Sequence, residues 1–219
     1  MQKLTTPFIV LSAGMLLVAP WIINAAPYES TMGLVQKVFY FHFPVAILFL
    51  VSAIICGVNS ARVLFWKNER ADGWAVAAAE LGFVLGALTL VTGPLWARKA
   101  WGVWWVWDAR LTMSLVLFLT FAAYMLLRRY GGPGSDRLGA GMALFGMVNV
   151  PFIYVSVNVW RTLHPMTSVV PTLPTDMGIP LWFCFAAFTM LFVALLNLRA
   201  TLEHQRTRLE ALYLAQDEA

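Results

Sequence analysis

Charged residues are scarce in this sequence. Only 12% of its 219 residues are Asp, Glu, Lys or Arg, whereas 60% are hydrophobic, and the mean hydropathy is +0.73. Soluble domains carry about 25% charged residues, so this chain has too little polar surface to cover a water-soluble globule. The composition therefore favours an all-α protein whose helices cross a lipid bilayer.

Cysteine is also rare, and its placement excludes one class of haem protein. Cys56 and Cys184 lie far apart in apolar segments, and the chain has no Cys-x-x-Cys-His motif. The chain therefore does not itself carry covalently attached c-type haem. Both cysteines are interpreted as small buried hydrophobic residues.

Six apolar runs stand out, each close to the ~20 residues that cross a bilayer. They cover approximately residues 7–26, 38–58, 74–94, 109–127, 138–160 and 179–198, and the short gaps between them hold nearly all the charge. No gap is long enough for a soluble domain. We predict a six-helix transmembrane domain over residues 1–198 and a helical tail over residues 199–219.

The Lys and Arg residues indicate an orientation. Ten of them belong to one set of ends, namely Lys3, Arg62, Lys67, Arg70, Arg128, Arg129, Arg137, Arg199, Arg206 and Arg208. Five belong to the other set, namely Lys37, Arg98, Lys99, Arg110 and Arg161. The positive-inside rule predicts that the first set, with both termini, is cytoplasmic; the flipped topology is the alternative. The basic residues form no stripe, which argues against nucleic acid as a partner.

Tryptophan is concentrated in the gap after the third run. Five of the ten tryptophans lie between Trp96 and Trp107, next to Asp108 and Arg110. If this stretch is helical, one face carries Trp101, Trp104, Trp105 and Asp108. Such a face would form a flat apolar platform suited to porphyrin, whose ring stacks on indoles and whose carboxylates can meet Arg or Lys. The alternative is a belt of interfacial tryptophans.

Two of the three histidines are predicted on the same side of the membrane as these tryptophans. His42 lies about one turn into the second run and His164 just beyond the fifth, whereas His204 lies in the tail and is expected to be solvated. Neutral imidazole is a common axial ligand of haem iron, and two imidazoles can bind from opposite faces. His42 and His164 are therefore the candidate iron ligands, although either alone could be a hydrogen-bonded residue at the membrane edge.

A few polar or small residues lie inside the apolar runs. Glu80 is a candidate functional residue, because a carboxylate within the membrane is costly, but it is close enough to the edge to reach water or a basic partner. Asn149 and Asn158 are expected to hydrogen-bond neighbouring helices, and Gly82 and Gly86 favour close helix packing.

The segment from Trp101 to Thr112, WGVWWVWDARLT, resembles the Trp-rich WWD signature of haem-handling membrane proteins. The residues after Asp108 resemble the haem exporter protein C branch (CcmC) of that family. Residues 36–44, around His42, and residues 156–164, around His164, resemble the two histidine segments of that branch. The resemblance covers nearly the whole chain; Pro165 departs from the pattern.

The resemblance implies a bacterial inner-membrane protein that binds haem b non-covalently at its outer, periplasmic face. It implies delivery of the haem to a membrane-anchored haem chaperone (CcmE) for c-type cytochrome biogenesis, which makes the protein a transfer component rather than a conventional enzyme. His42 and His164 would be the axial ligands. Other haem contacts would come from Trp101, Trp104, Trp105, Trp107, Asp108 and Arg110. A small subunit, CcmD, and an ABC-type complex of CcmA and CcmB are further implied partners.

Two other classes of protein are alternatives, and each would need features that this sequence lacks. A b-type cytochrome subunit that moves electrons across the membrane would need several His pairs stacked through the bilayer, and this chain offers one pair at one edge. An ABC-transporter permease subunit would need a cytoplasmic coupling helix and no Trp-dense outer loop.

Overall fold

The computed structural model describes residues 2–217, and most of these residues are helical. The long helices are α1 (Gln2–Ala25), α2 (Phe39–Trp66), α3 (Glu69–Trp101), α4 (Ala109–Tyr130), α5 (Ser135–Val159) and α6 (Thr175–Asp217). Two short 3-10 helices, η1 (Leu34–Val38) and η2 (Val170–Thr172), lie in connections. Within the described residues, six helices are long and apolar enough to cross a membrane. The predicted all-α fold with six transmembrane helices is therefore confirmed.

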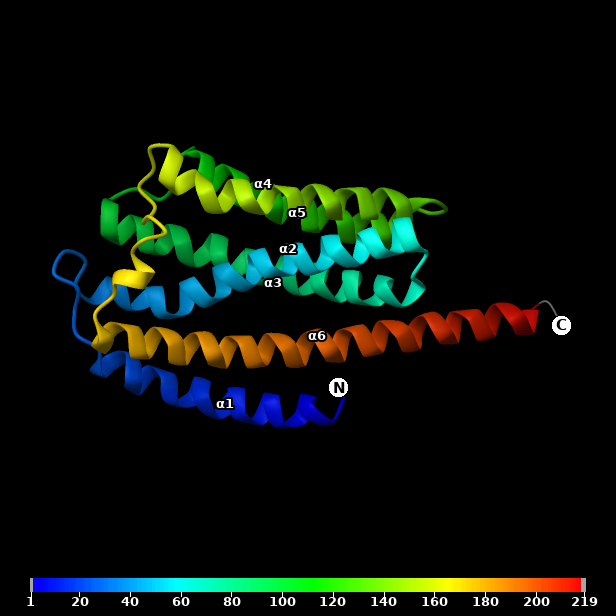
Figure 1. The fold of residues 1–219 in the computed structure, drawn as a ribbon, viewed down its shortest axis with the longest axis horizontal. Coiled ribbons are helices and arrows are strands. Elements are labelled where there is room, and N and C mark those ends of the chain that lie inside the picture. Colours follow the sequence, from blue (N-terminus) through cyan, green and yellow to red (C-terminus); the bar gives the residue numbers. More distant parts are fainter. Residues whose placement is uncertain (1, 218–219) are drawn as a thin grey trace.

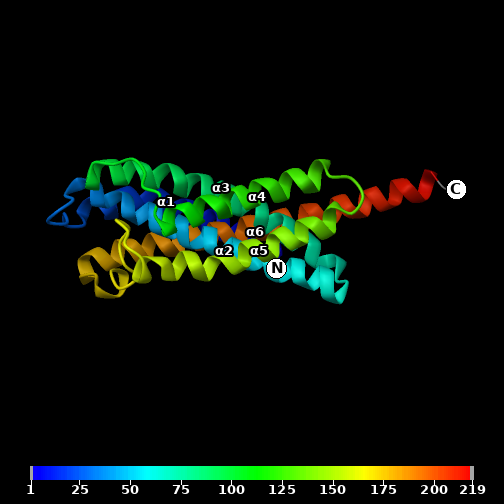
Figure 2. The ribbon, with the colours of Figure 1, turned by 90° about the horizontal axis from the view of Figure 1, so that it is seen from above.

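The helices lie side by side along one long axis (Figure 1). In the central four-helix bundle, α2 and α4 each pack against both α3 and α5. Helix α6 packs against α2 and α3, and α1 lies outermost, against α6. Figure 2 shows the same helices after a turn of 90°, with their connections gathered at two ends.

The two ends of the bundle differ in their connections. We call one the loop end, because it carries residues 26–38, 102–108 and 160–174. We call the other the tail end, because it carries the short turns 67–68 and 131–134 and the last part of α6, which projects beyond the other helices (Figure 1). Helix α6 passes through residue 198 without a break. The tail is therefore a continuation of the sixth transmembrane helix.

Helix α3 approaches its neighbours closely because small residues line its buried face. A Cβ atom on Gly82 would lie 2.5 Å from the Phe121 ring of α4, and one on Gly86 would lie 2.7 Å from the Phe49 ring of α2. Both positions therefore require glycine at the present helix separation. The close packing predicted from Gly82 and Gly86 is confirmed.

The two asparagines of α5 have different partners. Asn149 donates to the backbone carbonyl of Met113 in α4, with an N···O distance of 3.0 Å, as predicted. Asn158 instead pairs with the side chain of Thr167 in the loop that follows, at 2.9 Å. The prediction that Asn158 bonds a neighbouring helix is wrong, because it lies in the last turn of α5, next to that loop.

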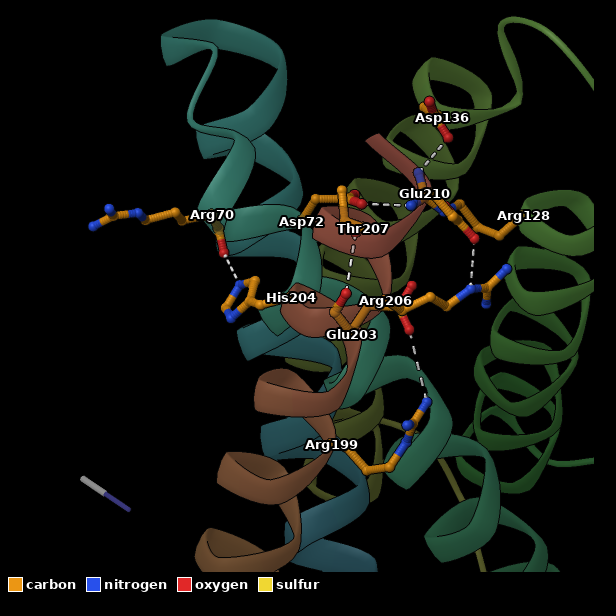
Figure 3. Close-up of polar contacts among 10 residues, drawn as sticks. All are labelled: Arg70, Asp72, Arg128, Asp136, Arg199, Glu203, His204, Arg206, Thr207 and Glu210. Carbon is orange, nitrogen blue, oxygen red and sulfur yellow. Dashed lines mark hydrogen bonds and ion pairs between the residues drawn. The ribbon is translucent and has the colours of Figure 1, made fainter. Parts of the chain in front are cut away.

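Ion pairs connect the helices at the tail end (Figure 3). Arg128 of α4 bonds Asp72 of α3 and Asp136 of α5, each at 2.5 Å. Arg199 of α6 donates to both carboxylate oxygens of Glu80 in α3, with N···O distances of 2.5 and 2.7 Å. Glu80 therefore has the basic partner that its position near the membrane edge allows.

His204 also connects α6 to α3. Its Nε2 atom lies 2.8 Å from the backbone carbonyl oxygen of Arg70 (Figure 3), and its ring is so near Gly73 that a Cβ atom there would lie 2.6 Å from it. His204 is partly exposed, as expected of a solvated residue, but it also has a partner in α3 that the sequence does not predict. The continuous α6 carries its side chain onto the first turn of α3, a contact between residues far apart in the chain.

We predict that Glu80→Gln lowers the free energy of unfolding by about 1–2 kcal/mol, because Arg199 loses its two-point carboxylate partner. The matched control is Glu210→Gln, which removes the exposed pair of Arg206 and Glu210 at 2.9 Å and should cost less than about 1 kcal/mol. Thermal unfolding of the detergent-solubilised protein measures both. Equal shifts for the two variants would contradict a structural role for the Glu80–Arg199 pair.

Candidate functional site

The loop end brings together the residues that the sequence predicts as a site. His42 lies in the first turns of α2, Arg110 in the first turn of α4, and His164 in the loop between α5 and α6. All three line one cavity, together with Trp101 and Trp105. The prediction that the two histidines and the Trp-rich segment lie on one side of the bundle is confirmed.

The Trp-rich segment is not a helix throughout. Helix α3 ends at Trp101, because Gly102 adopts a left-handed conformation (φ 76°) and Arg98 caps its carbonyl oxygen at 2.6 Å. Helix α4 begins after Asp108, whose carboxylate accepts the backbone N–H of Leu111 at 2.8 Å. Residues 102–108 between them have no regular secondary structure. The conditional expectation of a helical face carrying four of these residues is therefore wrong.

The five tryptophans divide into two groups. Trp96, Trp101 and Trp105 line the cavity, and Trp96 is only 5% exposed. Trp104 and Trp107 are 57% and 77% exposed and are absent from the cavity wall. The irregular backbone produces this division, since it does not repeat its side-chain direction as a helix would. Trp96, which is not among the site residues predicted from the sequence, contacts His42 with ring centroids 5.8 Å apart.

The hydrogen bonds of His42 determine which ring nitrogen is free. Its Nδ1 atom lies 2.8 Å from the hydroxyl oxygen of Thr92, and that hydroxyl donates its single proton to the carbonyl of Leu88 at 2.7 Å. The Thr92 oxygen must therefore accept a proton from Nδ1 of His42. The lone pair of a neutral imidazole then resides on Nε2, and this atom has no hydrogen-bond partner among the described residues.

His164 also has a protonated Nδ1 atom, but the acceptor here is a backbone carbonyl. Its Nδ1 atom lies 2.9 Å from the carbonyl oxygen of Pro165. A carbonyl can only accept, so Nδ1 carries the proton and the lone pair again resides on Nε2. Burial, followed by the nearby charge of Arg110, lowers the pKa of His164 to about 4, so the imidazole is neutral near neutral pH. A backbone or side-chain acceptor at Nδ1 is typical of histidines that bind metal through Nε2.

Two adjoining cavities meet at this site. Both are lined by His42, Trp96, Arg110 and His164, so these four side chains lie between them. The first, under the Trp-rich segment, has a volume of about 80 Å³. The second, about 270 Å³, extends past Tyr154 of α5 to Trp182 of α6. Pockets for drug-sized ligands measure about 300–1,000 Å³. Neither cavity alone reaches that size, so a ligand that fills both must displace the side chains between them.

The donor set suits one kind of metal centre. The described residues contain no group of three or more His, Cys, Asp or Glu side chains that could hold a bare metal ion. Two imidazoles are too few for such an ion, but haem supplies four nitrogens of its own and needs only axial ligands. In addition, the indole N–H groups of Trp96 and Trp105 are buried without an acceptor in the described part of the chain.

Fold and site together define a polytopic membrane protein with a tryptophan-lined, two-histidine cavity at one end of a helix bundle. The family profile described as heme exporter protein C matches residues 1–214. The heme exporter protein C of Bradyrhizobium diazoefficiens is 35% identical over 96% of this chain and 87% of its own length. That of Escherichia coli K12 is 32% identical over 88% and 81%. A Marchantia polymorpha protein, named a putative cytochrome c biosynthesis ccmC-like mitochondrial protein, is 32% identical over 76% and 72%.

The chain therefore belongs to the heme exporter protein C family, which handles haem in cytochrome c biogenesis. The resemblance seen in the sequence is confirmed at the level of the family. Two residues of the site, Thr92 and Trp96, are absent from the candidate residues predicted from the sequence. Thr92 carries no signal in the sequence, since it acts through one hydroxyl in an otherwise ordinary segment. Trp96 had a signal, because it opens the Trp-rich stretch.

We predict that Trp105→Ala and Trp104→Ala differ in the haem they retain after purification. Trp105→Ala should lose about threefold to tenfold, since an aromatic contact contributes roughly 0.5–1.5 kcal/mol beyond area burial. Trp104→Ala, which changes an exposed ring, should retain haem within about twofold of the wild type by the same reasoning. The measurement is haem per protein by absorbance of extracted haem. Equal losses would show that the whole segment is an interfacial belt.

Proposed function

We propose that this protein binds haem b non-covalently at its loop end, with His42 and His164 as axial ligands. We further propose that the loop end faces the periplasm and that the haem passes to the membrane-anchored haem chaperone CcmE. The product of this step serves c-type cytochrome biogenesis. The observation that carries the proposal is the pair of histidines on one cavity, each with its Nδ1 atom within hydrogen-bond distance of an oxygen and no such partner for Nε2 among residues 2–217.

The remaining wall of the cavity suits the porphyrin. Trp101 and Trp105 supply aromatic surface for the ring. Arg110 uses one guanidinium nitrogen on the carbonyl of Ile153 at 2.8 Å, and its other N–H donors are available to a haem carboxylate. The unpartnered indole N–H groups of Trp96 and Trp105 are further donors for the carboxylates. The haem contacts of Asp108, Trp104 and Trp107 stay predictions from the resemblance; these residues are absent from both cavity walls, and the proposal does not depend on them.

The two ligands differ in how firmly the protein holds them. His42 is buried within α2, and its position follows from helix packing. His164 is half-buried in the irregular loop between α5 and α6, where displacement disrupts no helix. A carrier must bind haem and later release it, and an unequal pair of ligands allows one iron bond to break first. We infer that the His164 bond breaks first during transfer.

The distribution of basic residues supports the orientation. Ten of the fifteen Lys and Arg residues belong to the tail end and to the chain termini, and five to the loop end. The loop end would then face the periplasm of a bacterial inner membrane, with the tail of α6 in the cytoplasm. The same family assignment supports CcmD and an ABC-type complex of CcmA and CcmB as further partners.

We predict that His42→Ala and His164→Ala each abolish transfer of haem to the chaperone and remove the six-coordinate, low-spin haem spectrum. Each variant should retain some haem through the other imidazole and the Trp-lined wall. Added imidazole should partly restore the low-spin spectrum by filling the vacant axial position. The measurements are visible spectra of the purified proteins and haem staining of the chaperone at equal membrane expression.

His204→Ala is the matched control, because His204 lies at the tail end and contacts Arg70. It should keep the wild-type haem spectrum, even if the loss of that contact lowers the melting temperature. Wild-type spectra and transfer in both His42→Ala and His164→Ala would refute the assignment of the axial ligands.

A further inference from the structure

A chain of hydrogen bonds joins the Trp-rich segment to the loop that carries His164. The Asp108 carboxylate accepts the backbone N–H of Leu111 through Oδ1, at 2.8 Å, and the hydroxyl of Thr162 through Oδ2. The Thr162 oxygen in turn accepts the backbone N–H of His164 at 3.0 Å. The first turn of α4 is thereby connected to the backbone of a proposed iron ligand.

The donor and the acceptor of each hydrogen bond in this chain can be assigned. The Thr162 hydroxyl has one proton, which goes to Asp108, and its lone pairs are then available for the N–H of His164. Both carboxylate oxygens of Asp108 are engaged, one by a helix N-terminus, where negative charge is stabilised. Hydrogen bonds to a carboxylate are stronger than those between neutral groups. Thr162 is therefore held firmly, and it holds the backbone next to the His164 side chain.

In the described part of the chain, few other side-chain hydrogen bonds hold the loop near His164. Residues 160–169 contain no helix or strand, and the next side-chain pair in the loop is that of Asn158 and Thr167 at 2.9 Å. Among residues 2–217, the imidazole of His164 is bonded only to the adjacent Pro165 carbonyl, which belongs to the same loop. The bond from Thr162 is thus the link nearest to His164 that connects it to a transmembrane helix.

We propose that Asp108 and Thr162 are positioning residues, which hold the His164 backbone so that its Nε2 atom reaches haem iron. This inference rests on the proposed function, because it assumes that His164 is an axial ligand. It gives Asp108 a role different from a haem contact: its carboxylate faces Thr162 and the N-terminus of α4, and Asp108 is absent from both cavity walls. Movement of the Trp-rich segment is then transmitted to one of the two iron ligands.

The test compares Thr162→Val with Thr162→Ser in the full-length protein, purified in detergent and loaded with haem b. Valine keeps the shape but lacks the hydroxyl, so the ratio of six-coordinate to five-coordinate haem should fall about fivefold or more, the factor that one neutral hydrogen bond contributes. Serine restores the hydroxyl and should restore the ratio. Added imidazole should return Thr162→Val to the low-spin form, because its vacant axial position accepts a free ligand.

The matched control is Thr172→Val in the same loop. It removes a hydroxyl bonded to the carbonyls of Ser168 and Val169. Thr172 itself lines neither cavity, although Val169 and Pro171 beside it line the second, and the substitution should leave the spectrum unchanged. If Thr162→Val does not accumulate as a folded protein, Asp108→Asn gives the same readout. Asparagine can still accept from Leu111, but its amide cannot accept from Thr162 while doing so, and the six-coordinate fraction should again fall.

His164→Ala, measured in parallel, separates the two possible failures. If His164→Ala converts the haem to the five-coordinate form while Thr162→Val and Asp108→Asn keep the wild-type spectrum, the positioning role is overturned and the proposed function stands. If His164→Ala itself keeps the wild-type spectrum, the ligand assignment fails and the positioning role fails with it. An equal fall for Thr162→Val, Thr162→Ser and Thr172→Val would show a general effect of loop stability and would also overturn the inference.

Discussion

A backbone N–H or C=O group left unpaired in the hydrocarbon of a membrane costs several kcal/mol, and water is not there to satisfy it. The six long helices meet most of this requirement by hydrogen bonds within each segment, although α1, α2, α3, α5 and α6 each contain at least one proline, which has no N–H to donate. Irregular backbone is therefore confined to the two ends of the bundle. At the tail end the turns are only 2 and 4 residues long (67–68 and 131–134), whereas the loop end holds three longer connections. The part of the chain free to build a ligand site thus lies at one boundary of the membrane.

Within that boundary region, a small number of hydrogen bonds gives the site its chemistry. A serine or threonine hydroxyl has one proton, and whichever acceptor takes it determines what the oxygen does next. Thr92 gives its proton to Leu88 and so receives that of His42, while Thr162 gives its proton to Asp108 and so receives the backbone N–H of His164. The Thr92 hydroxyl thereby determines the tautomer of His42, and the Thr162 hydroxyl holds the loop that carries His164.

The sequence predicts the large features of this protein and misses the small ones, for physical reasons. Apolar runs of about twenty residues suffice to predict the six helices, because lipid permits few other arrangements. Since successive helices cross the membrane in opposite directions, the same runs place His42 and His164 on one side. In the Trp-rich segment, the spacing of the tryptophans suits a helical face, but Gly102 ends α3 and Asp108 caps the start of α4, so the residues between them are irregular. The contacts of His204 with Arg70 and of Glu80 with Arg199 join residues more than 100 positions apart, and no local pattern encodes them.

The side chains between the two cavities have a thermodynamic consequence for the affinity of the protein. If a ligand must first separate them, part of the interaction energy is consumed by the opening, and the apparent dissociation constant rises by the inverse of the open fraction. Each tenfold reduction in that fraction weakens binding by about 1.4 kcal/mol. Substitutions that hold the cavities open would then tighten binding without adding any contact to the ligand, and would slow its departure. The side chains between the two cavities would in this way set an upper limit on affinity.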